Sequence, residues 1–265
     1  MTRPTTSTAT MTGVAGTVAA LALAGALTTT AHAAASTHAA THAATHAAAG
    51  APHRVHPSPS HFTHGRVGNR WFPLKPGTRW VYRGSEDGDR TRDVMIATYR
   101  TKVIDGVTCR VVFDRVWTNG RLSERTHDFY AQTKRGTVWY FGENTATLDR
   151  HGHVQSREGS FMSGVDGAQA GIFMTPRPHR GPSFRQEDYP GHAEDVFTVV
   201  RRGARVTVPL LASHQALLTQ ETTPLEPGVV DHKYYIRDIG DVRELTVKGG
   251  SESLRLIALT HQPRP

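Results

Sequence analysis

The chain has 265 residues, of which 31 are Lys or Arg and 23 are Asp or Glu, giving a formal net charge of +8 at pH 7. The basic residues are interspersed with acids and form no long run, which favours a solvated surface and predicts no nucleic-acid partner. The single cysteine, Cys109, excludes an internal disulfide and the Cys-rich classes of metal site. Because it lies in an apolar segment, we expect a buried, inert thiol.

Residues 1–33 have the pattern of a secretory signal peptide. Arg3 precedes an apolar run from Met11 to Leu27, and Ala31-His32-Ala33 matches the small-x-small cleavage pattern. The apolar run is short and interrupted by Gly and Thr, which argues against a membrane span. We therefore expect a protein that is secreted or associated with the cell wall.

Residues 34–61 are a low-complexity segment of Ala, Thr, His and Pro in which THAA occurs three times. This composition is typical of a disordered linker. His38, His42 and His46 are spaced to share one face of a helix, so weak capture of a transition-metal ion is compatible with the linker. The remaining residues, 62–265, are enough for a single β domain.

Strand patterns and short turns alternate from Trp71 to Phe141. Asp105-Gly106 and Asn119-Gly120 are strong hairpin signals, Gly136 marks a further turn, and Ser85 to Asp89 is expected to be a polar loop. The strands are expected over 78–83, 92–104, 108–118, 121–132 and 137–141.

The second half begins with an expected strand over 144–154 and a long irregular segment from Gly159 to Pro190, rich in Gly and Pro. Long loops in compact domains are usually functional or disordered. Strands resume over 194–201, 205–209, 216–223, 229–237, 242–248 and 253–260, with turns at Gly203 and Gly240. Roughly ten strands joined by short links predict an all-β fold, either a curved antiparallel sheet or an open barrel built as a meander.

The aromatic residues Trp80, Trp139, Tyr140 and Tyr235 are the candidates for binding a ligand. Aromatic side chains in an all-β core ordinarily serve packing, whereas a curved sheet with a hollow concave face would make the same residues line a pocket. Both interpretations are open. As core residues we expect Trp80, Val111, Trp139, Phe141 and Tyr235 to be largely buried.

A second group of candidates lies in and just after the irregular segment, where carboxylates are locally dense. Such oxygen ligands can coordinate Ca²⁺, or two of them can work as an acid and base pair. Alternatively, Glu194 and Asp195 pair with Arg185, Arg201 or Arg202 and fix the loop in place. The group consists of Asp166, Glu187, Asp188, His192, Glu194 and Asp195.

No nucleotide-binding glycine fingerprint, G-x-S-x-G elbow or HExxH motif occurs in the chain. His127 and Asp128 are neighbours in a strand and so point to opposite faces, while His151 and His153 flank a turn glycine and are expected at the surface. We therefore predict no catalytic residue, no resident metal and no cofactor.

Five segments carry a resemblance: FPLKPGTRWVY, FYAQTKRGTVWYFGE, GVDGAQAGIFM, FRQEDYPGHAED and LEPGVVDHKYYIRDIGDVRE. They resemble a widespread group of secreted bacterial β-rich proteins of uncharacterised function, and the resemblance covers nearly all of Trp71 to Leu259. More distantly, the PLKPG opening and the hairpin around Gly240 are similar to exported proteins with a fold like the lipoprotein-carrier half-barrel. That similarity implies a curved antiparallel sheet able to hold an acyl chain on its concave side, although no helical plug is evident here.

Three functions follow as hypotheses. The first is an exported, non-enzymatic domain that binds a ligand, with a hydrophobic one as a candidate, or another component of the envelope. The second is a secreted hydrolase with an acidic or metal-dependent site in residues 159–195. The third is a structural protein of the cell wall whose basic surface contacts an anionic polymer. The sequence does not indicate the ligand, the substrate or the oligomeric state.

Overall fold

The computed structural model describes residues 56–264, whose regular elements are fifteen β-strands and one short 3-10 helix, Pro59–His61. This confirms the all-β prediction. In this part of the chain no helix is long and apolar enough to cross a membrane. The expected signal peptide, and the linker up to residue 55 with its three spaced histidines, lie outside the described residues.

The described structure begins inside the segment expected to be a linker. His56 is 4% exposed, its Nε2 lies 2.7 Å from Asp105 Oδ2, and its ring packs against Phe62 and Phe141. Within the described residues, contacts of the folded domain therefore include His56, which precedes the expected boundary at residue 62.

The first half of the sheet is a meander of five long strands. Asp105-Gly106 and Asn119-Gly120 form its hairpin turns as predicted, and both residues of each turn have positive φ, as a type I′ turn requires. Asp87-Gly88 makes a third such turn, so the polar loop expected over Ser85 to Asp89 is wrong: the strands continue to the turn on both sides. The strands are β1 (Thr78–Glu86), β2 (Asp89–Ile104), β3 (Val107–Thr118), β4 (Arg121–Gln132) and β5 (Val138–Leu148).

The second half is another meander, and it joins the first because β15 pairs with β1. Gly203 is not a turn as expected. The strand runs through it, and the pairing register shifts there between Arg202 and Ala204, which is a β-bulge with a glycine at positive φ. The strands are β11 (Val196–Val208), β12 (Leu211–Thr222), β13 (Val230–Ile236), β14 (Gly240–Lys248) and β15 (Ser253–His261).

The segment between the two meanders is more regular than expected. Residues 144–148 do not start a new strand but continue β5, and β6 (Val154–Ser156) then pairs back onto it. The segment expected to be irregular, Gly159 to Pro190, holds four short strands that use the sheet edges. They are β7 (Phe161–Met162), β8 (Gln169–Met174), β9 (Ser183–Arg185) and β10 (Glu187–Asp188).

These short strands link the two edges of an open sheet. The strand order is β10-β8-β5-β4-β3-β2-β1-β15-β14-β13-β12-β11-β9. β9 and β10 are separated by Gln186 alone, yet β9 extends the edge at β11 and β10 extends the edge at β8. A glycine is required where they meet β8, because a Cβ on Gly171 would lie 2.2 Å from the carbonyl oxygen of Gln186.

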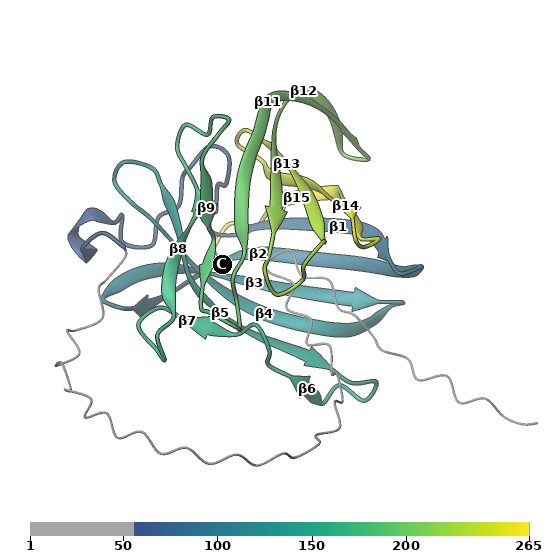
Figure 1. Ribbon diagram of the computed structural model, residues 1–265, viewed down its shortest axis with the longest axis horizontal. Helices are drawn as coiled ribbons and strands as arrows, with labels where there is room; N and C mark the ends of the chain where they lie inside the picture. The colour runs from purple at the N-terminus through teal and green to yellow at the C-terminus, as the bar shows by residue number, and fades with distance from the viewer. Residues whose placement is uncertain (1–55, 265) are drawn as a thin grey trace, which may run out of the picture.

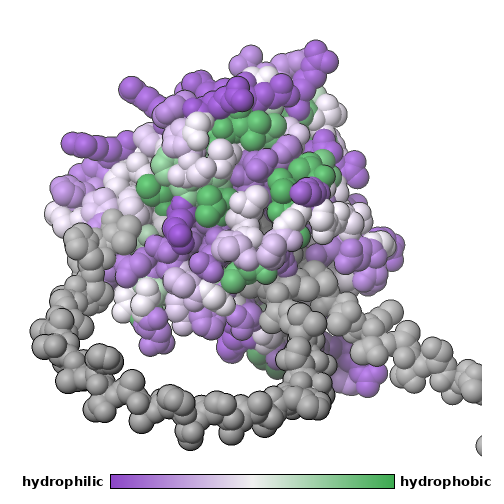
Figure 2. All heavy atoms as spheres, in the orientation of Figure 1, coloured by the Kyte–Doolittle hydropathy of each residue, from purple (hydrophilic) through white to green (hydrophobic). Residues whose placement is uncertain are grey.

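The sheet curls so that its second half crosses the first. In Figure 1, β11, β12 and β13 run across β1 to β4, and one core cluster contains side chains from both halves. Of the residues expected in the core, all are at most 8% exposed, which confirms that prediction for Trp80, Val111, Trp139, Phe141 and Tyr235. On the face shown in Figure 2, hydrophobic residues form separate patches between hydrophilic ones.

Candidate functional site

The interior of the curled sheet is acidic as well as apolar. Ten Asp and Glu side chains are buried among the described residues, whereas Lys233 and Arg110 are the buried Lys and Arg side chains there. A buried carboxylate without a positive partner is costly, so such groups tend to hold a proton. The ten are Asp93, Asp114, Glu124, Asp128, Glu143, Glu187, Glu221, Asp241, Glu244 and Glu252.

One hydroxyl group bridges two of these carboxyl groups. Asp128 and Glu143 lie directly opposite each other on β4 and β5, and Tyr140 Oη lies 2.8 Å from Asp128 Oδ1 and 2.8 Å from Glu143 Oε2. A phenol has one proton to donate, so the second contact requires a protonated carboxyl group. Burial, and next the neighbouring Asp114, raises the pKa of Asp128 to about 8, while burial and Glu187 raise the pKa of Glu143 well above its ordinary value.

A second pair lies on the neighbouring strands β2 and β3. Burial, and next the charge of Asp114, raises the pKa of Asp93 well above its ordinary value. Burial also raises the pKa of Asp114, and the neighbouring Arg115 offsets part of this effect. Neither carboxyl oxygen of Asp93 has a hydrogen-bond partner in residues 56–264, so the pair holds a proton because of burial and mutual repulsion.

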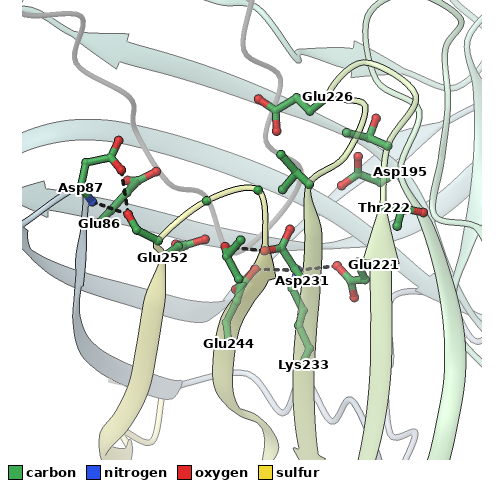
Figure 3. A pocket seen from close by; sticks show the side chains of 16 residues that line it. Glu86, Asp87, Asp195, Glu221, Thr222, Glu226, Asp231, Lys233, Glu244 and Glu252 are labelled. Carbon is green, nitrogen blue, oxygen red and sulfur yellow. Dashed lines mark hydrogen bonds and ion pairs between the residues drawn. The ribbon is translucent and has the colours of Figure 1, made fainter.

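Three chain reversals at one end of the sheet surround a cavity of about 210 Å³, which Figure 3 shows from close by. They are the β1–β2 turn, the β12–β13 loop and the β14–β15 turn. The described part of the chain contributes eight acidic side chains and a single basic one, Lys233, to the cavity wall. We call this cavity the acidic pocket; its acids are Glu86, Asp87, Asp195, Glu221, Glu226, Asp231, Glu244 and Glu252.

Lys233 does not supply a free positive charge to the pocket. Its Nζ lies 2.7 Å from Glu221 Oε2 and 3.3 Å from Glu244 Oε1, and Figure 3 shows the lysine reaching between these two side chains. Burial lowers the pKa of Lys233, but the two carboxylates more than offset this effect and raise it well above its ordinary value. The lysine thus neutralises part of the wall, in which acids still outnumber it.

Two buried carboxyl oxygens of the wall have no hydrogen-bond partner among residues 56–264. They are Glu244 Oε2 and Glu252 Oε1, on side chains from residues that are 5% and 6% exposed. Buried polar atoms in native structures are almost always hydrogen-bonded, so unpartnered oxygens beside a cavity indicate a missing donor. Burial, and next Glu86, raises the pKa of Glu252 to about 8, and burial and Glu221 raise the pKa of Asp195 to about 7.

The aromatic candidates lie in the packed core. Trp80 Nε1 donates to the carbonyl oxygen of Ile239 at 2.7 Å, and Tyr140 stacks on Tyr130 with ring centroids 4.6 Å apart. Tyr235 lines a void of about 10 Å³, which has room for about one water molecule. Trp139 belongs to a second cluster, on the other face of β3, β4 and β5, which Phe62 covers.

Arg185 lies near two of the acidic candidates of the irregular segment. Arg185 Nη1 lies 3.2 Å from Asp188 Oδ1 and 3.9 Å from Glu194 Oε1, as the loop-fixing interpretation expects of Arg185. Arg202 instead lies over the ring of Trp71, 5.8 Å from its centroid. No group of three or more His, Cys, Asp or Glu side chains in residues 56–264 is placed to hold a metal ion.

Of the remaining candidates, Glu187 and Asp195 are neighbours: the Glu187 N–H lies 3.3 Å from the carbonyl oxygen of Asp195, and burial followed by the charge of Asp195 raises the pKa of Glu187. Glu187 is buried in the interior, Asp195 is in the wall of the acidic pocket, and Asp166 is exposed. His192 is exposed and stacks on Tyr189, with its Nδ1 3.4 Å from Glu158 Oε1. Asp195 is therefore the member of this group that reaches the pocket.

Most of the pocket residues were missed in the sequence. Four of them lie on expected strands: Glu221, Asp231, Lys233 and Glu244. Position along the strand is the signal, because residues two apart in a strand point to the same face of the sheet. Asp231 and Lys233 precede the core residue Tyr235 by four and two residues, so they face the interior with it. Charged residues at inward positions of a strand are unusual, and here they identify the site.

Comparison with known proteins gives a distant likeness in structure alone. No protein-family model and no curated protein matches the chain in sequence. A candidate exported protein with a YmcC-like fold from Bacteroides fragilis NCTC 9343 shares 11% identity at a TM-score of 0.42, over 72% of this chain and 99% of that one. A candidate lipoprotein from Parabacteroides distasonis ATCC 8503 shares 10% identity at a TM-score of 0.37, over the same fractions of the two chains. At TM-scores this low, neither likeness carries an inference for this chain.

Proposed function

We propose that the protein is an exported binding domain whose acidic pocket takes an organic cation carrying amine or guanidinium groups. The observation that supports this most is the wall of the pocket, where eight acids face one lysine that two of them already neutralise. Export rests on the signal-peptide pattern of residues 1–33. A wall of this kind favours a cation over the hydrophobic ligand considered from the sequence.

The shape of the pocket favours an organic cation over a bare metal ion. The cavity of about 210 Å³ is far larger than a single dehydrated ion, and no three of its carboxylates are placed for coordination. An ammonium or guanidinium group donates several hydrogen bonds in different directions, which suits unpartnered oxygens such as Glu244 Oε2 and Glu252 Oε1.

Calorimetric titration with spermidine at low salt and at pH 8, where Glu252 with its pKa of about 8 is partly ionised, tests this proposal. We expect binding by the wild type and a loss of roughly tenfold or more in Glu252→Gln, because a charge-assisted hydrogen bond is worth about 1.5–3 kcal/mol. The matched control is Glu158→Gln, an exposed carboxylate outside the pocket, which should bind like the wild type. Equal affinities in the three proteins, or displacement of a fluorescent fatty acid by the wild type without spermidine binding, would contradict the proposal.

The pH dependence of this binding has a definite sign. Because a cation binds best to ionised carboxylates and the pKa values of Asp195 and Glu252 are about 7 and about 8, affinity should increase as the pH rises from 6 to 8. Spermidine stays largely protonated in this range, so the change reports the protein.

A hydrolase that uses the same pocket is the second candidate. It is favoured by Glu252, whose pKa of about 8 keeps a proton available at neutral pH in the wall of the pocket. Chromogenic ester and glycoside substrates test it: activity that is lost in Glu252→Gln and insensitive to a chelator would support the hydrolase over the binding domain.

A further inference from the structure

The outer face of the sheet carries four arginines side by side. Arg243 lies opposite Arg255, Arg255 opposite Arg83, and Arg83 opposite Arg92, so the row crosses β14, β15, β1 and β2. Aromatic residues end the row on both sides, since Tyr234 lies opposite Arg243 and Trp117 lies opposite Arg92. We call these four residues the arginine row.

The arginine row points away from the acidic interior. Its members alternate along their strands with buried residues such as Tyr82, Asp93 and Leu254, and neighbouring residues of a strand face opposite sides of a sheet. Arg83 and Arg255 are exposed, while Arg92 and Arg243 are partly exposed. The row and the acidic pocket are therefore on opposite faces of one sheet.

No acid in the described residues neutralises this row. The Lys and Arg ion pairs of residues 56–264 involve Arg70, Arg185 and Lys233 but none of the four arginines. Like charges directly opposite each other on neighbouring strands destabilise a sheet, so four in succession reduce stability. Such a cost is expected where the charges serve binding.

The geometry points to a site for a linear polyanion, a polymer with a phosphate or carboxylate group on successive units. Neighbouring strands lie about 4.8 Å apart, so the row extends over about 15 Å, and guanidinium groups bind both kinds of oxyanion through paired hydrogen bonds. Beside the row, Arg83, Arg90, Arg92 and Trp117 line an open hollow next to the β3–β4 turn, where a charged group can bind.

A polymer without bases fits this surface better than a nucleic acid. Binding of single-stranded nucleic acid uses aromatic faces on which bases stack. Here the Arg92 guanidinium lies 4.8 Å from the centroid of Trp117. The Arg115 guanidinium lies over the ring of Phe113 at 4.6 Å, and the His127 ring stacks on Phe113 with centroids 4.6 Å apart. Cations and imidazole thus already cover the rings of this face.

Affinity measurements at several salt concentrations, with polyphosphate and polyglutamate as probes, test the inference. We expect the wild type to bind at least one of them, with an affinity that falls as salt rises. Arg83→Gln/Arg255→Gln should lower the slope of log affinity against log salt by about 2, because each of the two arginines neutralises one oxyanion of the polymer and accounts for about one unit of slope. The melting temperature of this variant should not fall, because the substitution relieves repulsion.

The control is Arg150→Gln/Arg180→Gln, which removes the same charge from exposed positions outside the row and should keep the wild-type slope. An equal loss in both variants would overturn the inference, since binding would then depend on net charge alone. Tighter binding to a single-stranded oligonucleotide than to either probe, or binding to anionic vesicles alone, would overturn it as well. Glu252→Gln should bind both probes like the wild type, which separates this site from the acidic pocket.

Discussion

At the scale of single residues, the hydroxyl of Tyr140 has a defined task between Asp128 and Glu143. Tyr140→Phe removes it and leaves two buried carboxyl groups opposite each other without their shared partner. We expect the free energy of unfolding to fall by about 1–3 kcal/mol, measured by urea denaturation. Tyr189→Phe is the control, because the Tyr189 side chain is partly exposed and stacks on His192.

The Tyr140→Phe result also reports on the shared proton. If the loss came from packing alone, it would be the same at every pH. An unbridged pair repels more strongly when both members ionise, so the destabilisation should grow as the pH rises toward the Asp128 pKa of about 8. A loss that does not depend on pH would contradict the bridging role.

The buried residues could be predicted from the sequence when they were apolar. Trp80 and Tyr235 lie in strands with clear alternation, and hydrophobic burial places them in the core as expected. The partners of Lys233 could not be predicted in the same way, because their approach depends on strand register. Glu244 lies opposite Lys233 in the β13–β14 pair, whose register shifts at two bulges, and Glu221 lies two residues beyond the residue opposite Lys233 on β12. Charged residues in a strand are ordinarily assigned to the solvent side, and here that default conceals the site.

At the scale of elements, the sequence predicts tight turns from their own residues, but it does not predict which distant strands pair. Asn119-Gly120 determines a hairpin by its own backbone preferences. Gly203, in contrast, takes positive φ inside a strand, where the bulge depends on the partner strand β12. The short strands β9 and β10 have almost no strand pattern in their own residues. They form because each pairs with an edge strand of the sheet, β9 with β11 and β10 with β8.

The segment before the first strand gives a test at this scale. His56 is buried and its Nε2 lies 2.7 Å from Asp105 Oδ2, so removing residues 34–61 takes away an interaction that removing residues 34–55 retains. We expect the shorter deletion to keep the wild-type melting temperature and the longer one to lower it by several degrees. The reason is that leaving a buried polar group without its hydrogen-bond partner lowers the free energy of unfolding by about 1–3 kcal/mol.

The point variant His56→Ala, made in the chain that lacks residues 34–55, is the control for chain length. It should reproduce most of the loss, because it removes the ring packing against Phe62 and Phe141 as well as the partner of Asp105. Identical melting temperatures for the two deletions would show that residues 56–61 do not stabilise the domain.

At the scale of the whole molecule, the net charge of +8 hides a division between two faces. The interior collects carboxyl groups and the outer face of β14, β15, β1 and β2 collects arginines, so the sheet separates charge across its thickness. Composition reports the sum of the two faces and cannot report their separation. Both proposed sites, one for a cation and one for a polyanion, follow from this arrangement.

The same division makes the stability of the whole domain depend on pH in an unusual direction. Asp128 and Glu252 have pKa values of about 8, and Asp195 and Asp241 of about 7, all raised mainly by burial above the unfolded values of about 4. The folded state therefore binds protons more tightly than the unfolded state. The stabilisation is complete below pH of about 4 and is lost as the pH rises through the folded pKa values, so the free energy of unfolding should decrease from pH 5 to pH 8.

The measurement is the melting temperature at matched ionic strength across this range. Asp128→Asn should flatten the curve, because each raised carboxyl group contributes a slope of up to about 1.4 kcal/mol per pH unit and this variant removes one. Asp149→Asn is the control: Asp149 is at the surface and backbone hydrogen bonds lower its pKa, so it does not titrate between pH 5 and pH 8. A melting temperature that is constant or rises over this range would contradict the buried, protonated state of these carboxyl groups. If spermidine occupies the acidic pocket, it should raise the melting temperature more at pH 8 than at pH 5, because it pairs with the carboxylates whose repulsion destabilises the domain there.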